Sequence, residues 1–354
     1  MELLEYLYEK PPSQSYFHPR NYQIKSSKTL ILGMPKCGIT SIIIDFLSSL
    51  DEKNYLYLDL DDMRLGEIQI QKLNKFIKIK DISYLVIENY NKDFPLPKVK
   101  NIILSSHNLT LHLKDFHTLH VKGLYFEEFI AYQQRNFNTQ HIFSLYSNSG
   151  TYPKSAMLSK YENKTYMQEA IKLSLPDPIS QNLFLTLATN QAIPYSLFKA
   201  YNELKPKIKI SKDKLYQKAK ELEEMGLINF VEKFNSPRSP KKIYLNNFSL
   251  KNAITHKKDF VKRFENMIFC QLNEKEIFYT NQIHFYLPKK NQAIIAIPFL
   301  TLSLILGRFQ KLLPTLKKLN IKDLYIITLN STGKDQKEGI KCEILSFWDW
   351  ALGL

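Results

Sequence analysis

Several residue types are scarce in this chain of 354 residues, and each shortage excludes something. Its three cysteines, Cys37, Cys270 and Cys342, lie far apart, so they form no metal-binding spacing and indicate a reducing compartment. No apolar run reaches about 18 residues, the length that spans a bilayer, so we expect no membrane span. The first residues, MELLEYLYEKPPSQ, are acidic and polar, unlike a secretory signal. We therefore expect a cytoplasmic protein.

Arginine is also scarce, because only 6 of the 49 basic residues are Arg, although the formal net charge is +15. Such an excess of positive charge makes nucleic acid a candidate partner. The shortage of Arg, with many Asn and Ile, is equally typical of a lysine-biased genome, so charge alone does not decide. The length predicts two or three domains.

The apolar pattern divides the chain into four segments. Residues 1–27 are predicted to be a polar lead-in. In residues 28–175, short apolar runs such as TLILG and YLVIENY alternate with helical segments, which predicts a parallel sheet covered by helices. Residues 176–250 predict three helices followed by a hairpin, the order of a winged helix. Residues 251–354 again predict mixed α/β structure.

The stretch ILGMPKCGITS has the frame of a phosphate-binding loop, G-x-x-x-x-G-K-[ST]. It follows an apolar strand and opens an apolar helix, which is the context that the motif requires. We expect nucleotide to be bound by Gly33, Met34, Pro35, Lys36, Cys37, Gly38, Ile39, Thr40 and Ser41, with Thr40 holding Mg²⁺.

The lysine of that motif is replaced by Ile39, which cannot donate a hydrogen bond to a phosphate. Losing one charge-assisted contact costs roughly 1.5–3 kcal/mol, or about 10- to 100-fold in affinity. Lys36 lies within the loop and is an alternative cation. The strand YLVIENY gives a second departure, because Glu88 can hold metal but Asn89 cannot act as a base.

The order of these blocks resembles the bacterial and archaeal AAA-type ATPases that carry a winged helix and a C-terminal nuclease-like domain. The matching blocks are ILGMPKCGITSII, YLYLDLDD, YLVIENY, NIILSSHN, GLYFEEFIAY, SNSGTYPKSAML, KKIYLNN, FENMIF and ILSFWDWAL. The resemblance implies ATP and Mg²⁺ at the first domain, with Glu88 at the metal-carboxylate position and Ser105 or Ser106 near the sensor position.

The same resemblance implies a restriction-endonuclease-like fold for residues 251–354. Cleavage there needs a helical Glu, a hairpin Asp and a Glu-x-Lys strand around Mg²⁺. Glu265 keeps the helix position, but His284 stands at the Asp position and Ala296-Ile297-Pro298 at the strand position, so we expect no cleavage. A lone Glu265 is more often solvated or a capping residue. Pro298 suggests an edge strand or a bulge.

The third helix and the hairpin of the expected winged helix are rich in lysine. They suggest contacts to duplex DNA from Lys212, Lys214, Lys218, Arg238, Lys241 and Lys242. The alternative is a solvated hairpin with a helix that contacts protein. No aromatic stacking platform for single strands is evident.

Together these observations predict an α/β protein with three parts: a P-loop parallel-sheet domain, a winged-helix domain and an inactive restriction-endonuclease-like α/β domain. We expect an ATP-binding protein with a degenerate phosphate loop, a regulatory or binding role, and weak or absent hydrolysis. One alternative is a non-enzymatic DNA-binding or assembly protein, with a protein partner or self-association, that no longer binds nucleotide. Another is an ATPase in which Lys36 or a partner subunit replaces the missing cation.

Overall fold

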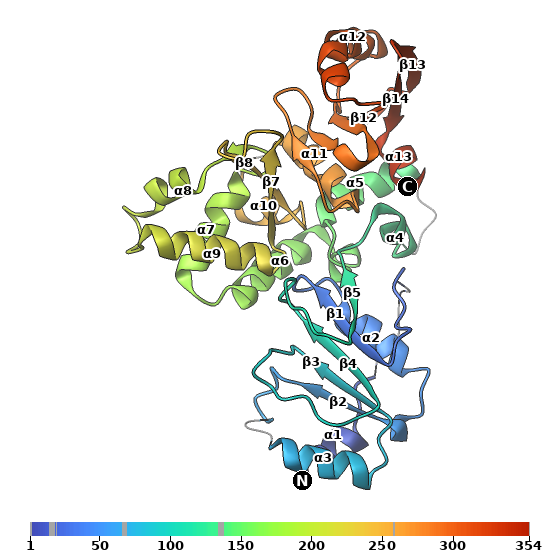
Figure 1. Cartoon of the computed structure of the whole chain (residues 1–354), viewed down its shortest axis with the longest axis vertical. Helices are drawn as coiled ribbons and strands as arrows, with labels where there is room; N and C mark the ends of the chain where they lie inside the picture. The colour runs from blue at the N-terminus through green and yellow to red at the C-terminus, as the bar shows by residue number, and fades with distance from the viewer. Residues whose placement is uncertain are drawn as a thin grey trace. The chain divides into compact units, whose positions relative to one another are not determined.

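The computed structural model describes residues 2–13, 18, 20–65, 69–133, 138–257 and 259–353. The chain forms two compact units (Figure 1). Unit 1 comprises Met1–Gly123 with Glu224–Gly226, and unit 2 comprises Leu124–Glu223 with Leu227–Leu354. The predicted domain boundaries at residues 175 and 250 stay predictions.

Unit 1 is built on parallel strands. They are β1 (Lys28–Gly33), β2 (Tyr55–Asp59), β3 (Tyr84–Glu88), β4 (Asn101–Ser106) and β5 (His117–Val121). Their order in the sheet is β2-β3-β4-β1-β5, and every neighbouring pair is parallel. Strand β1 therefore lies between β4 and β5, where the order of the strands changes direction. The carboxyl edge of an open α/β sheet at such a point is where ligands bind.

Helices cover both faces of this sheet, which explains its nearly continuous apolar strands. They are α1 (Glu2–Glu9), α2 (Ile39–Leu47) and α3 (Ile70–Ile79). Leu4 of α1 and Phe76 of α3 join one buried cluster with alternate strand residues. Side chains alternate along a strand, so the intervening residues face the other side. There the ring of Phe46 in α2 lies 5.7 Å from that of Tyr84. The predicted lead-in, residues 1–27, thus contributes a helix to the core.

Unit 2 is rich in helices, several of which begin after a capping side chain. They are α4 (Phe126–Ala131), α5 (Thr139–Ser149), α6 (Lys160–Ser174), α7 (Pro178–Thr189), α8 (Leu197–Leu204), α9 (Lys212–Glu224), α10 (Leu250–Ile254), α11 (Phe260–Gln271), α12 (Leu302–Lys318) and α13 (Phe347–Gly353). Ser159, Asp177, Ser196 and Asp259 accept first-turn N–H bonds of α6, α7, α8 and α11.

One mixed sheet runs through unit 2. Its strands are β6 (Pro194–Tyr195), β7 (Ile228–Lys233), β8 (Lys241–Leu245), β9 (Phe278–Tyr279), β10 (Phe285–Leu287), β11 (Gln292–Ala296), β12 (Asp323–Thr328), β13 (Gly333–Lys337) and β14 (Ile340–Ser346). They lie in the order β13-β14-β12-β11-β10-β9-β7-β8-β6. The parallel pairing of β7 with β9 joins the antiparallel hairpin β7–β8 to the C-terminal strands.

Strand β11 corrects one prediction. It lies between β10 and β12, so it is neither an edge strand nor bulged. The strand ends at Ala296, and Pro298 comes after that end, where its missing N–H interrupts no ladder. Among the described residues, no helix has both the length and the apolar character needed to cross a membrane.

Candidate functional site

The turn between β1 and α2 requires glycine at both ends. A Cβ on Gly33 would lie 2.6 Å from Cys37 Sγ and 2.7 Å from the Val121 carbonyl oxygen, so no other residue fits without movement. Gly38, directly before α2, is left-handed with φ 95°. Lys36 is also left-handed, with φ 68°, and its side chain is exposed. The predicted glycine positions therefore shape a tight turn between the buried strand and the helix.

Apolar side chains fill the inside of this turn. Ile39 is 3% exposed, and its Cδ1 lies 3.1 Å from the position of a Cβ on Gly33. Cys37 is buried as well, and burial raises the pKa of its thiol to about 12. The thiol therefore stays protonated and neutral, and the inner face of the turn carries no charge from either side chain.

At the start of α2, several backbone N–H groups face no acceptor from the described residues. In the described part of the chain, the N–H groups of Gly38, Thr40 and Ser41 donate to no protein atom, and α2 has no side-chain cap. These are the first-turn donors that every helix leaves unpaired. Together with the helix dipole they favour an anion at this end.

A polar cluster lies beside these donors, at the carboxyl ends of β2 and β3. Thr40 Oγ1 and the Tyr57 hydroxyl each donate a hydrogen bond to the carboxylate of Glu88, one to each oxygen. Glu88 is 6% exposed, and this burial raises its pKa, although the two hydroxyl bonds oppose the rise. The structure therefore brings together Thr40 and Glu88, the two residues that the sequence assigned to Mg²⁺.

The departures from the motif are also placed by the structure. Asn89 is left-handed, and its Nδ2 donates to Asp59 Oδ1 at 2.7 Å. Ser105 Oγ accepts the Asn89 N–H at 3.4 Å, so this serine lies under the Asn89 backbone. His107 contacts the turn, because its Nδ1 lies 2.8 Å from the Gly33 carbonyl oxygen. The role that the resemblance implies for Ser105 or Ser106, near the sensor position, stays a prediction.

Arg20 is a site residue that the sequence did not reveal. It is 8% exposed, and its guanidinium donates to the Cys37 carbonyl at 2.7 Å and to the Lys122 carbonyl at 2.9 Å. A trans peptide group points its carbonyl and its N–H in opposite directions. The hydrogen bond from Arg20 to the Cys37 carbonyl therefore holds this peptide group so that the Gly38 N–H points away from the guanidinium.

In unit 2, the predicted pseudo-nuclease positions form a buried charged cluster around Glu265. Lys242 Nζ and the Tyr244 hydroxyl both lie 2.7 Å from Glu265 Oε1. Lys262 Nζ lies 3.4 Å and His284 Nε2 3.9 Å from Oε2. The side chain of Glu265 is completely buried, so the expectation of a solvated or capping residue is wrong.

His284 is held in its neutral form within this cluster. Its Nδ1 accepts the Ala296 N–H at 3.0 Å, which places the proton on Nε2, toward Glu265. Burial lowers the pKa of His284 to about 4, against the opposite pull of Glu265. Burial alone would raise the pKa of Glu265, but electrostatic interactions with His284, Lys242 and Lys262 and the hydrogen bond from Lys242 together lower it.

These two groups predict that acid destabilises unit 2. A group with a lowered pKa in the folded state binds more protons when unfolded, so stability falls as pH drops from about 6.5, the ordinary value for His, to about 4. Glu265 acts in the same direction at lower pH. Urea unfolding at several pH values should show a weaker acid dependence for His284→Asn, whose amide oxygen still accepts the Ala296 N–H. An equal change with His256→Asn, on the surface, would contradict this assignment.

The six cations assigned to DNA separate into three groups. Lys212, Lys214 and Arg238 are exposed. Lys218 is paired with Asp177 and Glu221, and Lys241 with Glu232. Lys242 is buried against Glu265, so it presents no charge at the surface.

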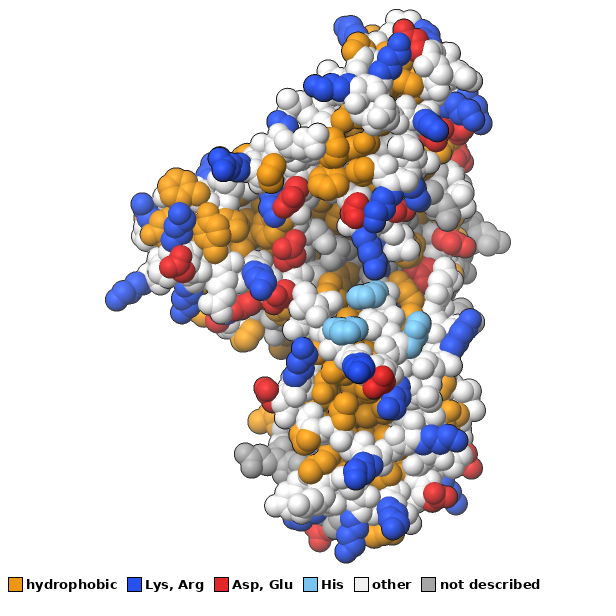
Figure 2. Space-filling model, viewed as in Figure 1, with side chains coloured by type: hydrophobic (Ala, Val, Ile, Leu, Met, Phe, Trp, Pro, Cys, Tyr) orange, Lys and Arg blue, Asp and Glu red, His pale blue; other side chains and the backbone are white. Residues whose placement is uncertain are grey.

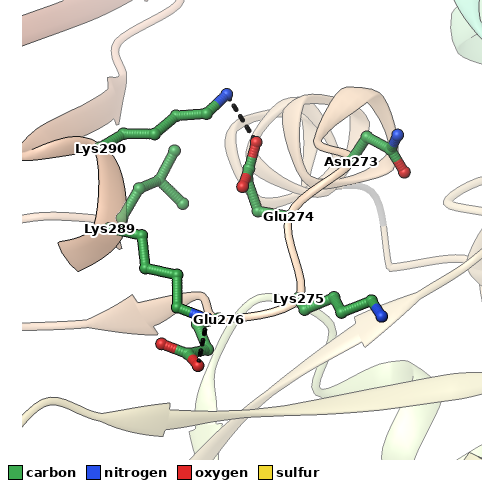
Figure 3. A pocket seen from close by; sticks show the side chains of 7 residues that line it. Asn273, Glu274, Lys275, Glu276, Lys289 and Lys290 are labelled. Carbon is green, nitrogen blue, oxygen red and sulfur yellow. Dashed lines mark ion pairs between the residues drawn. The ribbon is translucent and has the colours of Figure 1, made fainter.

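A hollow of about 230 Å³ in unit 2 is lined by Asn273, Glu274, Lys275, Glu276, Leu287, Lys289 and Lys290 (Figure 3). Ion pairs join Lys289 to Glu276 at 2.8 Å and Lys290 to Glu274 at 2.6 Å. These four charges neutralise one another, and we assign no ligand there. Among the described residues, no three His, Cys, Asp or Glu side chains gather as a metal site.

Comparison with known proteins finds distant similarity. No protein-family model matches the sequence. The uncharacterized protein MJ1544 of Methanocaldococcus jannaschii is 23% identical over an alignment of 400 residues, which covers 91% of this chain and 88% of that protein.

Three solved structures are also similar, each with a TM-score below 0.5. The Walker-type ATPase PABY2304 of Pyrococcus abyssi has a TM-score of 0.44 and 17% identity, covering 64% of this chain and 91% of that one. A STAND protein with a tetratricopeptide repeat sensor, PH0952 of Pyrococcus horikoshii, gives 0.29 and 13%, covering 70% and 43%. The Aeropyrum pernix ORC1 protein, solved in complex with DNA, gives 0.33 and 10%, covering 65% and 87%.

Proposed function

We propose that unit 1 binds ATP with Mg²⁺ at the turn between β1 and α2 and hydrolyses it weakly or not at all, so that its role is binding or regulation. The observation that carries this proposal is the pairing of the Thr40 hydroxyl with the Glu88 carboxylate beside unpaired amides of α2. Both groups lie at the sheet edge where open α/β proteins bind ligands.

Two sets of groups would contact the phosphates and the metal ion. The N–H groups of Gly38, Thr40 and Ser41 and the helix dipole would hold phosphate oxygens. Hydroxyl and carboxylate oxygens are the ligands that Mg²⁺ prefers, so Thr40 and Glu88 fit this ion. Bound there, Mg²⁺ would supply positive charge near the phosphates. Arg20 contributes indirectly, because it fixes the Cys37 carbonyl and with it the direction of the Gly38 amide.

Weak hydrolysis follows from two side chains. Ile39 supplies no charge to the phosphates, and charge stabilisation dominates phosphoryl transfer. The amide of Asn89 cannot accept a proton from water, and it is already bonded to Asp59. Phosphate release above background would therefore require a cation from elsewhere, such as the exposed Lys36 or one from a partner subunit, and also a group that accepts the proton in place of Asn89.

Thermal unfolding with millimolar Mg-ATP tests the proposal. Ligand at about 100 times its Kd stabilises a protein by about 2.7 kcal/mol, which raises Tm by several degrees. We expect this shift to depend on Mg²⁺ and to fall in Thr40→Val, which keeps the shape of the side chain but removes the hydroxyl. AMP with Mg²⁺ serves as the ligand control.

The absence of any shift in Tm at millimolar Mg-ATP would contradict nucleotide binding. It would favour the rival candidate, a non-enzymatic DNA-binding or assembly protein that no longer binds nucleotide. An unchanged shift in Thr40→Val would keep ATP binding but reject the metal assignment.

A further inference from the structure

Two exposed aromatic rings and a lysine share one surface on α8 and α9. Lys212 Nζ lies 5.5 Å from the ring centre of Phe198 and 5.8 Å from that of Tyr216. Phe198 is 53% exposed and Tyr216 40%. Figure 2 shows hydrophobic and basic side chains gathered at the left, where Figure 1 places α8 and α9. The sequence pattern alone did not reveal this surface, because its rings come from two different helices.

One of these rings, Tyr216, also lines a cavity of about 300 Å³. Its wall includes Tyr216 and Ala219 of α9, Tyr195 before α8, and Phe230 of β7. Lys220 and Arg238 also line it, and Arg238 is exposed on the hairpin loop. The volume is at the lower end of ligand pockets, so a nucleobase with its sugar fits this size.

Positive charges outnumber negative ones at the cavity, which is lined by Lys220, Arg238 and Lys241 and by Glu223. From Lys199 to Glu224 the sequence contains eight lysines and five acidic residues. Several of these cations lie over aromatic rings: Lys199 over Tyr195 at 5.2 Å and Lys205 over Tyr201 at 5.5 Å. A positive surface that interleaves cations with aromatic rings matches a polyanion that also offers flat, apolar groups.

We propose that this surface binds single-stranded nucleic acid. An unstacked base enters the cavity against Tyr216, a neighbouring base stacks on Phe198, and the phosphates contact Lys212 and Arg238. Base–aromatic stacking tolerates any sequence, because every base has a flat face. When a base covers Phe198, the Lys212 ammonium moves from the ring to a phosphate.

Single strands fit this surface better than duplex DNA for two reasons. The bases of a duplex already stack on one another, so exposed rings add nothing to its binding. Three of the six cations expected to contact a duplex are committed elsewhere: Lys218 and Lys241 to neighbouring acids, and Lys242 to Glu265. The proposal does not depend on nucleotide binding in unit 1.

Fluorescence anisotropy with the full chain tests the proposal. The probe is a labelled oligothymidylate of about 16 nucleotides, within the site sizes of single-strand binders. Phe198→Ala and Tyr216→Ala should each weaken binding roughly 5- to 150-fold. Phe198→Tyr should keep it, and Leu304→Ala, an exposed apolar truncation on α12, is the matched control. Lys212→Gln should reduce the slope of log K against log salt by about one.

Two further probes decide the role of the bases. An abasic strand of equal length should bind weakly, and a duplex of equal length should bind less tightly than the single strand. The proposal is overturned by equal affinity for all three probes, by Phe198→Ala and Tyr216→Ala both binding like the native chain, or by no binding at low salt. A change in self-association in place of oligonucleotide binding would instead assign the rings to a protein interface.

Discussion

Lys242→Met is expected to lower the free energy of unfolding of unit 2 by about 3–5 kcal/mol, because removal of one partner of a buried ion pair leaves an uncompensated charge. Glu265 would remain with both oxygens buried, losing the ammonium at 2.7 Å. The Tyr244 hydroxyl at 2.7 Å and Lys262 at 3.4 Å would stay, but neither replaces the full contact. Urea unfolding, read from the ellipticity of the whole chain, gives this energy.

A double-mutant cycle separates charge from packing. Glu265→Gln in the Lys242→Met background removes the isolated charge and should recover a large part of the loss. Lys262→Met is the matched control, because its ammonium is partly exposed and lies farther from the carboxylate, so it should cost less than about 1 kcal/mol. If the double variant is no more stable than Lys242→Met, the loss comes from packing and not from the charge.

This cluster also shows where sequence reasoning ends. Lys241 and Lys242 are adjacent, and both were assigned to DNA because a hairpin after three helices suggests a wing. Successive side chains of a strand point to opposite faces, so only one of the two reaches solvent. Lys242 is the one that faces inward, because that face of β8 packs against α11. No local pattern of the sequence shows which face of β8 makes this contact.

The parallel sheet of unit 1 was more predictable. Its strands are buried on both faces and read as apolar runs, and the predicted strand before Gly33 is confirmed as β1. Helices α5 and α6 were missed, because their sequences, TQHIFSLYSNS and KYENKTYMQEAIKLS, carry many polar residues between the apolar ones. A capping box at Ser159 and Glu162 was the available signal for α6.

In the candidate site too, residues within motifs could be predicted from the sequence, and residues placed only by tertiary contacts could not. Thr40 and Glu88 were named from their motifs, and they meet in the structure. Arg20 belongs to no motif, and His107 lies in the block NIILSSHN but was given no role there. They contact the turn across 17 and 74 residues of sequence. The exposed pair Phe198 and Tyr216 was equally hidden, since it requires the packing of α8 beside α9.

Ile39→Lys is expected to tighten ATP binding roughly 10- to 100-fold, the effect of one charge-assisted contact to a phosphate. The aliphatic part of the lysine side chain can occupy the space that Ile39 fills, where the Ile39 Cδ1 lies near Gly33. Its ammonium would then lie on the side of the turn that is proposed to bind phosphate. Without ligand the variant should be somewhat less stable, because a side chain that is 3% exposed is replaced by a charged one. Isothermal titration with Mg-ATP measures the affinity.

Ile39→Met is the control for this experiment, since it has a long unbranched side chain without charge. Equal ATP affinity of the lysine and methionine variants would contradict the proposal that phosphate binds at this turn. Phosphate release should stay at background in Ile39→Lys, because the amide of Asn89 still cannot take a proton from water. Ile39→Lys is therefore expected to raise the affinity for ATP without raising the rate of hydrolysis. The new ammonium contacts a phosphate, but the site still has no base to accept a proton from water.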